Sequence, residues 1–138
     1  MDKKQLLLTV VPGAAFGISI WMFRGSIHAW WQIFGVCLLV VGFVLWTIAR
    51  FQLGASFSVT AQARRLVTHG LYSKVRNPIY IFGSWVIAGA FLAAGHPIWL
   101  LIFIIVIPMQ IWRARKEAAV LEAKFGEEYR AYRASTWF

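Results

Sequence analysis

Arg76, Asn77 and Pro78 form a polar triplet directly before an apolar run, where a helix start and a positive charge coincide. Asparagine is a favoured N-cap and proline fits the first helical position, so the triplet predicts a helix that begins at Pro78. The free N–H groups of such a helix start, with the Arg76 guanidinium beside them, attract a carboxylate or a phosphate. Taken alone, the triplet favours a simpler interpretation: a capped helix at a membrane surface, with Arg76 extending towards the headgroups.

Arg113 and Glu117 form a second candidate pair, four residues apart on a predicted helix. Glu117 shares a helix face with Leu121, at a spacing that places an acid among apolar residues. A buried carboxylate is costly unless it is paired or hydrogen-bonded, so Glu117 is a candidate acceptor for hydroxyls or an amine of a ligand. The alternative is a surface ion pair worth about 0.2–0.5 kcal/mol. Nearby, Gly70 permits a tight turn beside Tyr72, whose hydroxyl can contact a ligand while its ring packs.

Composition places these residues in a membrane protein. The chain has 138 residues, enough for one domain; 60% are hydrophobic and 14% are charged. A soluble domain of this size could not bury so much apolar surface. The net charge of +9 comes from basic residues at the ends of apolar segments, so topology explains it and we expect no nucleic-acid partner. Cys37 and the three histidines show no metal-ligand spacing, and we expect no metal.

The expected architecture is an all-α integral membrane protein with four transmembrane helices. The spans are predicted at residues 6–23, 29–49, 78–94 and 97–112. A loop at 53–77 and a tail helix at 113–133 lie outside the spans. The sequence Gly95-His96-Pro97 predicts a tight turn that makes the last two spans an antiparallel hairpin.

Charge distribution predicts the orientation. With the N-terminus in the cytoplasm, all of the 14 lysines and arginines except Arg24 lie on the cytoplasmic side. We therefore expect both termini, the 53–77 loop and the tail helix to be cytoplasmic. The first apolar run begins after Lys3 and Lys4, as in a signal peptide, but bulky residues follow where a cleavage site would need small ones.

Two long motifs, LVTHGLYSKVRNPIY and RARKEAAVLEAKFGEEYRAY, resemble the isoprenylcysteine carboxyl methyltransferase and phospholipid methyltransferase superfamily. The resemblance covers roughly Leu53 to Arg133. It implies a multi-pass membrane enzyme that uses S-adenosylmethionine at its cytoplasmic face. It also implies that the loop, the turn before the third span and the tail glutamate enclose the cofactor. With Arg76 from the charge argument, the expected cofactor-binding residues are Arg65, Leu66, Val67, Tyr72, Arg76, Asn77, Pro78, Ile79, Tyr80 and Glu117.

The resemblance further implies that Arg113 handles the acceptor, so Arg113 and Glu117 are the expected catalytic residues. The chain departs from the family pattern where Asn77 replaces a common histidine and Ala118 replaces a second glutamate. It also ends in STWF, without the usual continuation of the tail. The glycine-rich motif of the phospholipid branch is not evident, which favours the isoprenylcysteine-like branch.

The expected reaction is therefore methyl transfer to a lipophilic acceptor, a lipid or small molecule, with a carboxylate favoured. A phospholipid amine is an alternative acceptor. A sterol-reductase-like enzyme that uses NADPH is a second alternative, although its motif fits RNPIY less well. A small four-helix transporter would need an acid inside a span to couple protons, and none of the four predicted spans contains one. A non-catalytic membrane scaffold is a further alternative. The sequence leaves the identity of the acceptor and the oligomeric state open.

Overall fold

The computed structural model describes residues 27–54 and 66–137, together with separate positions of the first apolar segment (10, 13, 14, 16–18, 20 and 21). The regular elements among the described residues are all helices, and no strand occurs there; one isolated backbone bridge joins Val75 to Trp137. This confirms the all-α expectation. The elements in chain order are α2 (Trp30–Leu53), the 3₁₀ turn η2 (Gly70–Ser73), α3 (Pro78–Ala93), the 3₁₀ segment η3 (Pro97–Ile102), α4 (Phe103–Phe125) and α5 (Glu127–Ser135).

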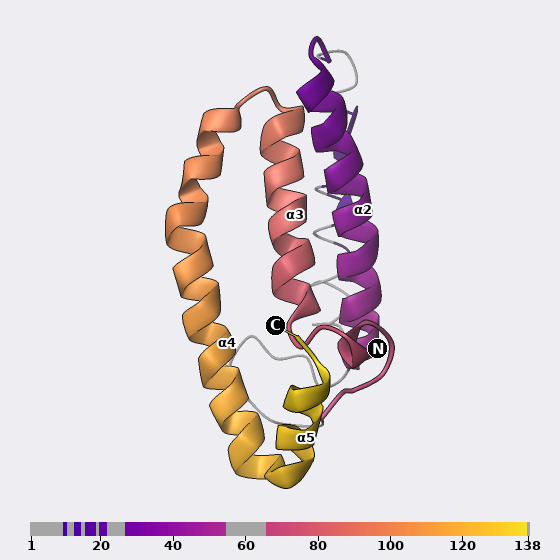
Figure 1. Ribbon diagram of the computed structural model, residues 1–138. Coiled ribbons are helices and arrows are strands. Elements are labelled where there is room, and N and C mark those ends of the chain that lie inside the picture. Colours follow the sequence, from indigo (N-terminus) through magenta and orange to yellow (C-terminus); the bar gives the residue numbers. More distant parts are fainter. Residues whose placement is uncertain are drawn as a thin grey trace.

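The helices form an open, elongated bundle (Figure 1). Helices α2 and α3 pack side by side along most of their length. Helix α4 returns antiparallel to α3 after the turn at Gly95, as the sequence predicts. Helix α5 then folds back beneath the start of α3. The turn η2, the start of α3, the end of α4 and α5 therefore lie at one end of the molecule.

Small residues bring α2 and α3 into close contact. The buried residues Gln32, Gly35, Leu39, Gly42 and Ala49 of α2 repeat at intervals of three, four and seven positions, which places them on one helix face. A Cβ atom added to Gly35 would lie 2.6 Å from the backbone nitrogen at position 93, inside van der Waals contact. Close backbone approach at glycine is the usual way in which helices associate within a membrane.

Helix α4 has a largely exposed apolar surface, including Ile104 (72% exposed) and Ile105 (69%). Together with η3 it extends roughly 45 Å, which exceeds the roughly 30 Å of a bilayer core. In the described part of the chain, two segments are long and apolar enough to cross a membrane, Trp30–Leu53 and Pro97–Phe125. Helix α3 is apolar but shorter. Such surfaces are typical of a protein embedded in lipid. The four spans and their orientation stay predictions, and the segment at 6–23 falls mostly outside the described residues.

The helix boundaries agree with expectation at α3 and differ elsewhere. Helix α2 continues to Leu53, one turn past the expected end of the second span. The expected tail helix at 113–133 is not separate from the fourth apolar segment, because α4 continues through both to Phe125. The tail divides at Gly126, where a glycine can break a helix, and α5 follows. Residues 111–117 contain no helix breaker, so the helix continues. Gly126 ends it by adopting a φ of 55°, which side chains other than hydrogen disfavour.

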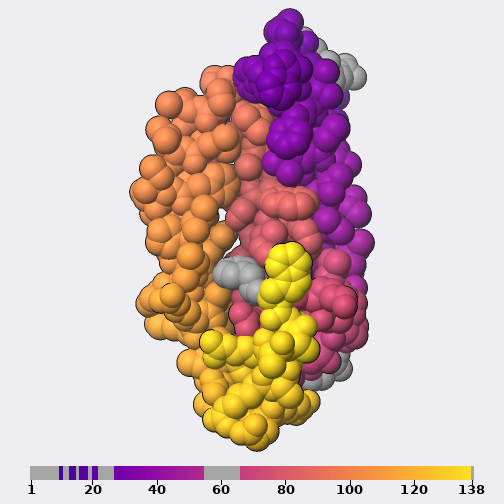
Figure 2. All heavy atoms as spheres, viewed as in Figure 1, coloured from indigo at the N-terminus to yellow at the C-terminus, as the bar shows by residue number. Residues whose placement is uncertain are grey.

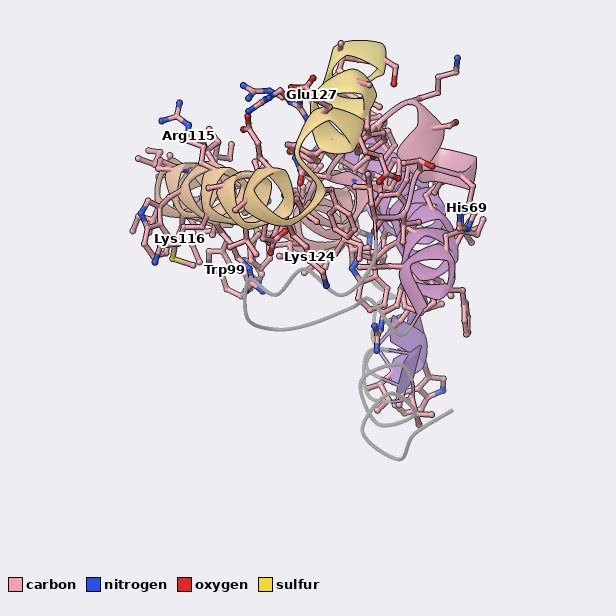
Figure 3. All side chains as sticks on the ribbon, turned by 90° about the horizontal axis from the view of Figure 1, so that it is seen from below. His69, Trp99, Arg115, Lys116, Lys124 and Glu127 are labelled. Atoms are coloured by element: carbon pink, nitrogen blue, oxygen red, sulfur yellow. The ribbon has the colours of Figure 1, made fainter. Side chains whose placement is uncertain are left out.

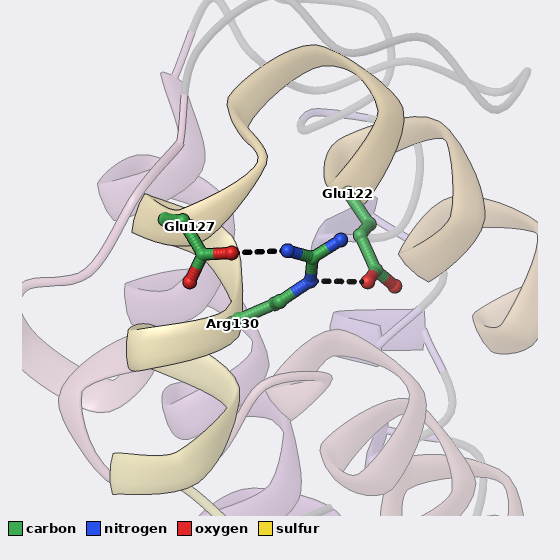
Figure 4. Close-up of polar contacts among 3 residues, drawn as sticks. All are labelled: Glu122, Glu127 and Arg130. Carbon is green, nitrogen blue, oxygen red and sulfur yellow. Dashed lines mark hydrogen bonds and ion pairs between the residues drawn. The ribbon is translucent and has the colours of Figure 1, made fainter.

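An ion-pair network holds the bend between α4 and α5 (Figure 4). Arg130 Nε lies 2.9 Å from Glu122 Oε1 of α4, and its Nη1 pairs with Glu127 in the first turn of α5. The bend returns α5 to the end of the molecule where η2 lies.

Substitution of Gly89 by alanine tests the close packing of α2 and α3. Its Cβ would overlap the backbone nitrogen of Leu39, so we expect Gly89→Ala to destabilise the fold by about 1–3 kcal/mol. Gly83→Ala is the matched control, because a Cβ there would lie 3.6 Å from the Trp46 side chain, an ordinary contact. Thermal unfolding in detergent, followed by tryptophan fluorescence, should show a lower Tm for Gly89→Ala alone. Equal Tm values for the two variants would contradict this packing.

Candidate functional site

Tyr80, Arg113 and Glu117 converge between α3 and α4. The Tyr80 hydroxyl donates a hydrogen bond to Glu117 Oε1 at 2.5 Å, and Arg113 Nε donates to the same oxygen at 3.2 Å. The Arg113 guanidinium also lies 5.9 Å from the centre of the Tyr80 ring, within cation–π range. The Arg113–Glu117 pair predicted from spacing is thus present, and the structure adds Tyr80 as a donor from the neighbouring helix. The Glu117 side chain is 28% exposed, so solutes can reach its carboxylate.

A second polar contact lies one turn further along the same two helices. The Ser84 hydroxyl lies 3.1 Å from Gln110 Oε1 and 2.8 Å from the Tyr80 carbonyl oxygen. Tyr80 and Ser84 are four residues apart on α3, while Gln110, Arg113 and Glu117 lie at i, i+3 and i+7 on α4. The two helices therefore turn their polar faces towards each other. The sequence contains this spacing, but the spacing alone does not determine which face of α3 meets which face of α4.

Asn77 and Pro78 start α3 as predicted, although the cap differs from expectation. Asn77 is the N-cap residue and Pro78 is the first helical residue, with its side chain fully buried. The Asn77 side chain makes no capping hydrogen bond; instead its backbone oxygen accepts from the N–H groups of Tyr80 and Ile81. The expected side-chain cap is therefore wrong, and the Asn77 amide is not used to hold the helix start.

The segment before α3 packs into a small apolar core. Val67 and Tyr72 are buried against Ala49, with Leu71 and Ile79 packed at the edge. The Gln52 side chain fixes the turn, because its Oε1 accepts a hydrogen bond from the Leu71 N–H at 2.8 Å. The expected site residues Val67 and Ile79 thus belong to this core, which positions the turn. Leu66 is half-buried beside it, whereas Arg65 lies outside the described residues.

Helix α5 covers this turn through two tyrosines that the sequence reading missed. Tyr129 and Tyr132 are 2% and 9% exposed, and the Tyr132 hydroxyl donates to the Tyr72 carbonyl oxygen at 2.7 Å. Beyond α5, the Trp137 N–H donates to the Lys74 carbonyl oxygen at 3.2 Å. The i,i+3 spacing of the tyrosines in EEYRAYR was the available signal for a buried face.

Arginines and other ionisable groups lie near these tyrosines and shift the pKa of their hydroxyls. Burial raises the pKa of the Tyr72 hydroxyl well above its usual value, and nearby Tyr132, Glu117 and Tyr80 raise it further, while Arg50 lowers it. Burial likewise raises the pKa of Tyr129, against a lowering by Arg76. The predicted cation Arg76 therefore lies close to α5. Arg50, which is 4% exposed at the end of α2, lies close to Tyr72 and was also missed by the sequence reading.

The result is a site of mixed character at the end of an apolar helical bundle. It contains a carboxylate with two donors, a helix start with an arginine beside it, and a covering layer of tyrosines. The fold is that of a helical protein with long, largely exposed apolar helices, and these polar groups gather at one end of it. No group of three or more histidine, cysteine, aspartate or glutamate side chains suited to a metal occurs among the described residues.

The chain belongs to the phospholipid methyltransferase family, whose pattern matches residues 30–128. This range includes α2, the turn, α3 and α4 with the Tyr80–Glu117 contact. No curated protein matches the sequence at a significant level.

The fold is similar to that of a solved eukaryotic protein, the intramembrane Ras methyltransferase ICMT (isoprenylcysteine carboxyl methyltransferase). The TM-score is 0.67 and the sequence identity is 23%. The match covers 99% of this chain and 52% of that protein, so the chain spans about half of its length. The superfamily inferred from the two sequence motifs is therefore confirmed.

Removal of the Tyr132 hydroxyl tests the docking of α5. Tyr132→Phe deletes the bond to the Tyr72 carbonyl, so we expect a loss of about 1 kcal/mol of stability at pH 8. Burial raises the pKa of Tyr132 to about 12 from a usual 10.0. The unfolded chain therefore loses this proton first as the pH rises above 10, and the contribution of Tyr132 to stability falls towards pH 12.

Thermal unfolding between pH 8 and pH 11 measures both effects. Tyr129→Phe is the control at pH 8, because it removes a tyrosine hydroxyl from the same helix but not this hydrogen bond. A Tyr132→Phe protein as stable as the wild type at pH 8 would show that the bond does not hold α5.

Proposed function

We propose that this protein transfers a methyl group from S-adenosylmethionine to a lipophilic acceptor at the cytoplasmic face of a membrane. The observation that carries the proposal is the placement of Glu117 between Tyr80 and Arg113, beside the start of α3. Family membership supports the reaction class. S-adenosylmethionine as the donor, a lipophilic acceptor and the cytoplasmic side of the membrane are the three points that we propose.

The residues present suit the chemical groups of S-adenosylmethionine. Its carboxylate matches the start of α3, where Asn77 has an uncommitted amide and Arg76 supplies a positive charge. Its amino group and ribose hydroxyls match the Glu117 carboxylate, which can accept hydrogen bonds at its second oxygen. Its adenine matches the ring of Tyr80, which is half-buried, whereas the Tyr72 ring packs in the core that supports the turn. Arg65, whose role rests on the family resemblance, stays a prediction.

The sulfonium of S-adenosylmethionine supplies an activated methyl group, so the protein needs to position the acceptor and exclude water. Tyr72, Tyr129 and Tyr132 are buried, and the Tyr132 hydroxyl ties α5 to the turn that contains Tyr72. Arg113 and Tyr80 hold Glu117 at a fixed position between two helices. In this proposal the chain therefore acts through orientation and shielding.

A carboxylate acceptor fits this site better than an amine. A carboxylate is ionised at neutral pH and attacks without losing a proton, whereas a protonated amine needs a base. Glu117 Oε1 already accepts hydrogen bonds from Tyr80 and Arg113, so this oxygen is engaged in joining the two helices. The Arg113 guanidinium has further N–H groups with which to orient an acceptor carboxylate. The family's name favours the second candidate, a phospholipid amine. In both cases the acceptor is lipophilic and enters from the bilayer.

Calorimetric titration with S-adenosylmethionine tests the cofactor assignment. We expect Glu117→Gln to weaken binding at least tenfold, because a neutral amide replaces the negative acceptor that the ligand's amino group and hydroxyls require. We expect a smaller loss for Tyr72→Phe. Glu128→Gln is the matched control, an exposed glutamate in the first turn of α5.

Wild-type affinity in Glu117→Gln would refute the assignment of this carboxylate to the cofactor. A parallel titration with NADPH tests the reductase alternative. Binding of NADPH without binding of S-adenosylmethionine would contradict the proposed reaction and favour a reductase.

A further inference from the structure

Helix α4 has two chemically opposed faces. The face towards α3 carries Gln110, Arg113 and Glu117, with the buried Ala114 among them. The opposite face carries exposed apolar residues for several turns, including Ile105, Met109 and Trp112. It then becomes basic within one turn, at Arg115 and Lys116, both exposed. A change from apolar to basic on a helix face in contact with lipid marks the boundary between acyl chains and headgroups.

The aromatic and basic residues at this boundary are joined. The Lys116 ammonium lies 4.0 Å from the centre of the Trp112 ring, a close cation–π contact. Trp112 is 58% exposed, and an exposed tryptophan at the end of an apolar segment is typical of the interface between membrane and water. The contact holds the charge of Lys116 at that level and restricts the freedom of a long side chain.

Arg115 and Lys116 differ from the arginines that serve the fold. Arg113 pairs with Glu117, and Arg130 pairs with Glu122 and Glu127. The positions three and four residues from Arg115 and Lys116 contain no acid, and no described carboxylate forms an ion pair with either. Figure 3 shows Arg115 and Lys116 projecting from different sides of α4. Figure 2 shows α4 as a continuous outer wall of the molecule.

We propose that Arg115 and Lys116 bind the phosphate of an anionic membrane lipid, whose acyl chains lie along Ile105, Met109 and Trp112. The two cations follow each other in the chain and project in different directions, so their long side chains approach a phosphodiester from two sides, while the apolar residues above them complement the chains. Glu117 is bonded to Tyr80 of α3, whereas Arg115 and Lys116 are exposed, so this lipid is distinct from the methyl acceptor. The inference requires a membrane-embedded α4 and does not depend on methyl transfer.

Native mass spectrometry of the purified protein with equal amounts of phosphatidylglycerol and phosphatidylcholine tests this site. Each cation near a membrane surface favours an anionic lipid about fivefold, so we expect Arg115→Gln/Lys116→Gln to lower the phosphatidylglycerol preference roughly 25-fold. Trp112→Leu should lower it by a smaller factor, because it removes the ring that positions Lys116. High salt should weaken the wild-type preference.

Lys124→Gln/Arg133→Gln is the matched control. It removes the same charge at exposed positions of α4 and α5 that lie outside the basic turn of the outer face. The control should keep the wild-type preference. An unchanged preference in Arg115→Gln/Lys116→Gln would overturn the proposal, as would an equal loss in both double variants, because net charge alone would then explain the binding. The tryptophan-fluorescence Tm of each variant verifies that it is folded.

Discussion

The hydrogen bond from Tyr80 to Glu117 is the contact on which the arrangement of this protein depends. Helix α4 buries little of its surface, and most of its apolar side chains point away from the rest of the protein. Its hydrogen bonds to α3 include the Tyr80–Glu117 contact and the neighbouring Ser84–Gln110 contact. Lipid tails are as apolar as these side chains, so there is no hydrophobic driving force for two helices to associate in a membrane. Polar contacts of this kind therefore contribute much of the attraction between helices. The same bond fixes the carboxylate of the candidate site.

The two helix interfaces of the bundle are built differently. Helices α2 and α3 meet through glycines whose backbones touch, so their relative position is tightly determined. Helices α3 and α4 meet through polar side chains, with less surface in contact. A rigid pair thus carries the start of α3 and the buried turn, while a loosely packed helix brings Arg113 and Glu117 to it. Helix α5 completes the site by returning across the turn through the Arg130 ion pairs and the Tyr132 hydroxyl.

The sequence predicted the local features well. The start of α3 at Pro78, the turn at Gly95 and the Arg113–Glu117 pair all depend on residues close together in the chain, where cap chemistry and helix spacing are decisive. Contacts between distant segments were not predictable in the same way. The Tyr80–Glu117 bond joins residues 37 positions apart and requires the rotation of two helices. The Tyr132–Tyr72 bond joins residues 60 positions apart and requires the bend at Gly126.

The predicted end of a membrane span does not coincide with the end of a helix in this protein. The predicted end of the fourth span at Trp112 marks where the side chains change from apolar to charged, but the backbone does not respond to that change. Arginine, lysine, glutamate and alanine all favour helix, so α4 continues through the charged stretch to Gly126. Membrane depth and secondary structure are set by different properties of the residues. This continuity places Arg113 and Glu117 on the same rigid helix as Gln110.

The most direct test of the proposed reaction is the transfer of label from methyl-labelled S-adenosylmethionine to a lipid extract, read by mass spectrometry. The wild-type protein should produce a labelled lipophilic compound, and release of the label as methanol by mild alkali would identify a carboxylate ester. A labelled compound that resists alkali would identify an amine acceptor instead. If no labelled lipophilic compound forms with a folded protein and an extract rich in both acceptor classes, the site beside Tyr80 and Glu117 does not perform methyl transfer to lipids.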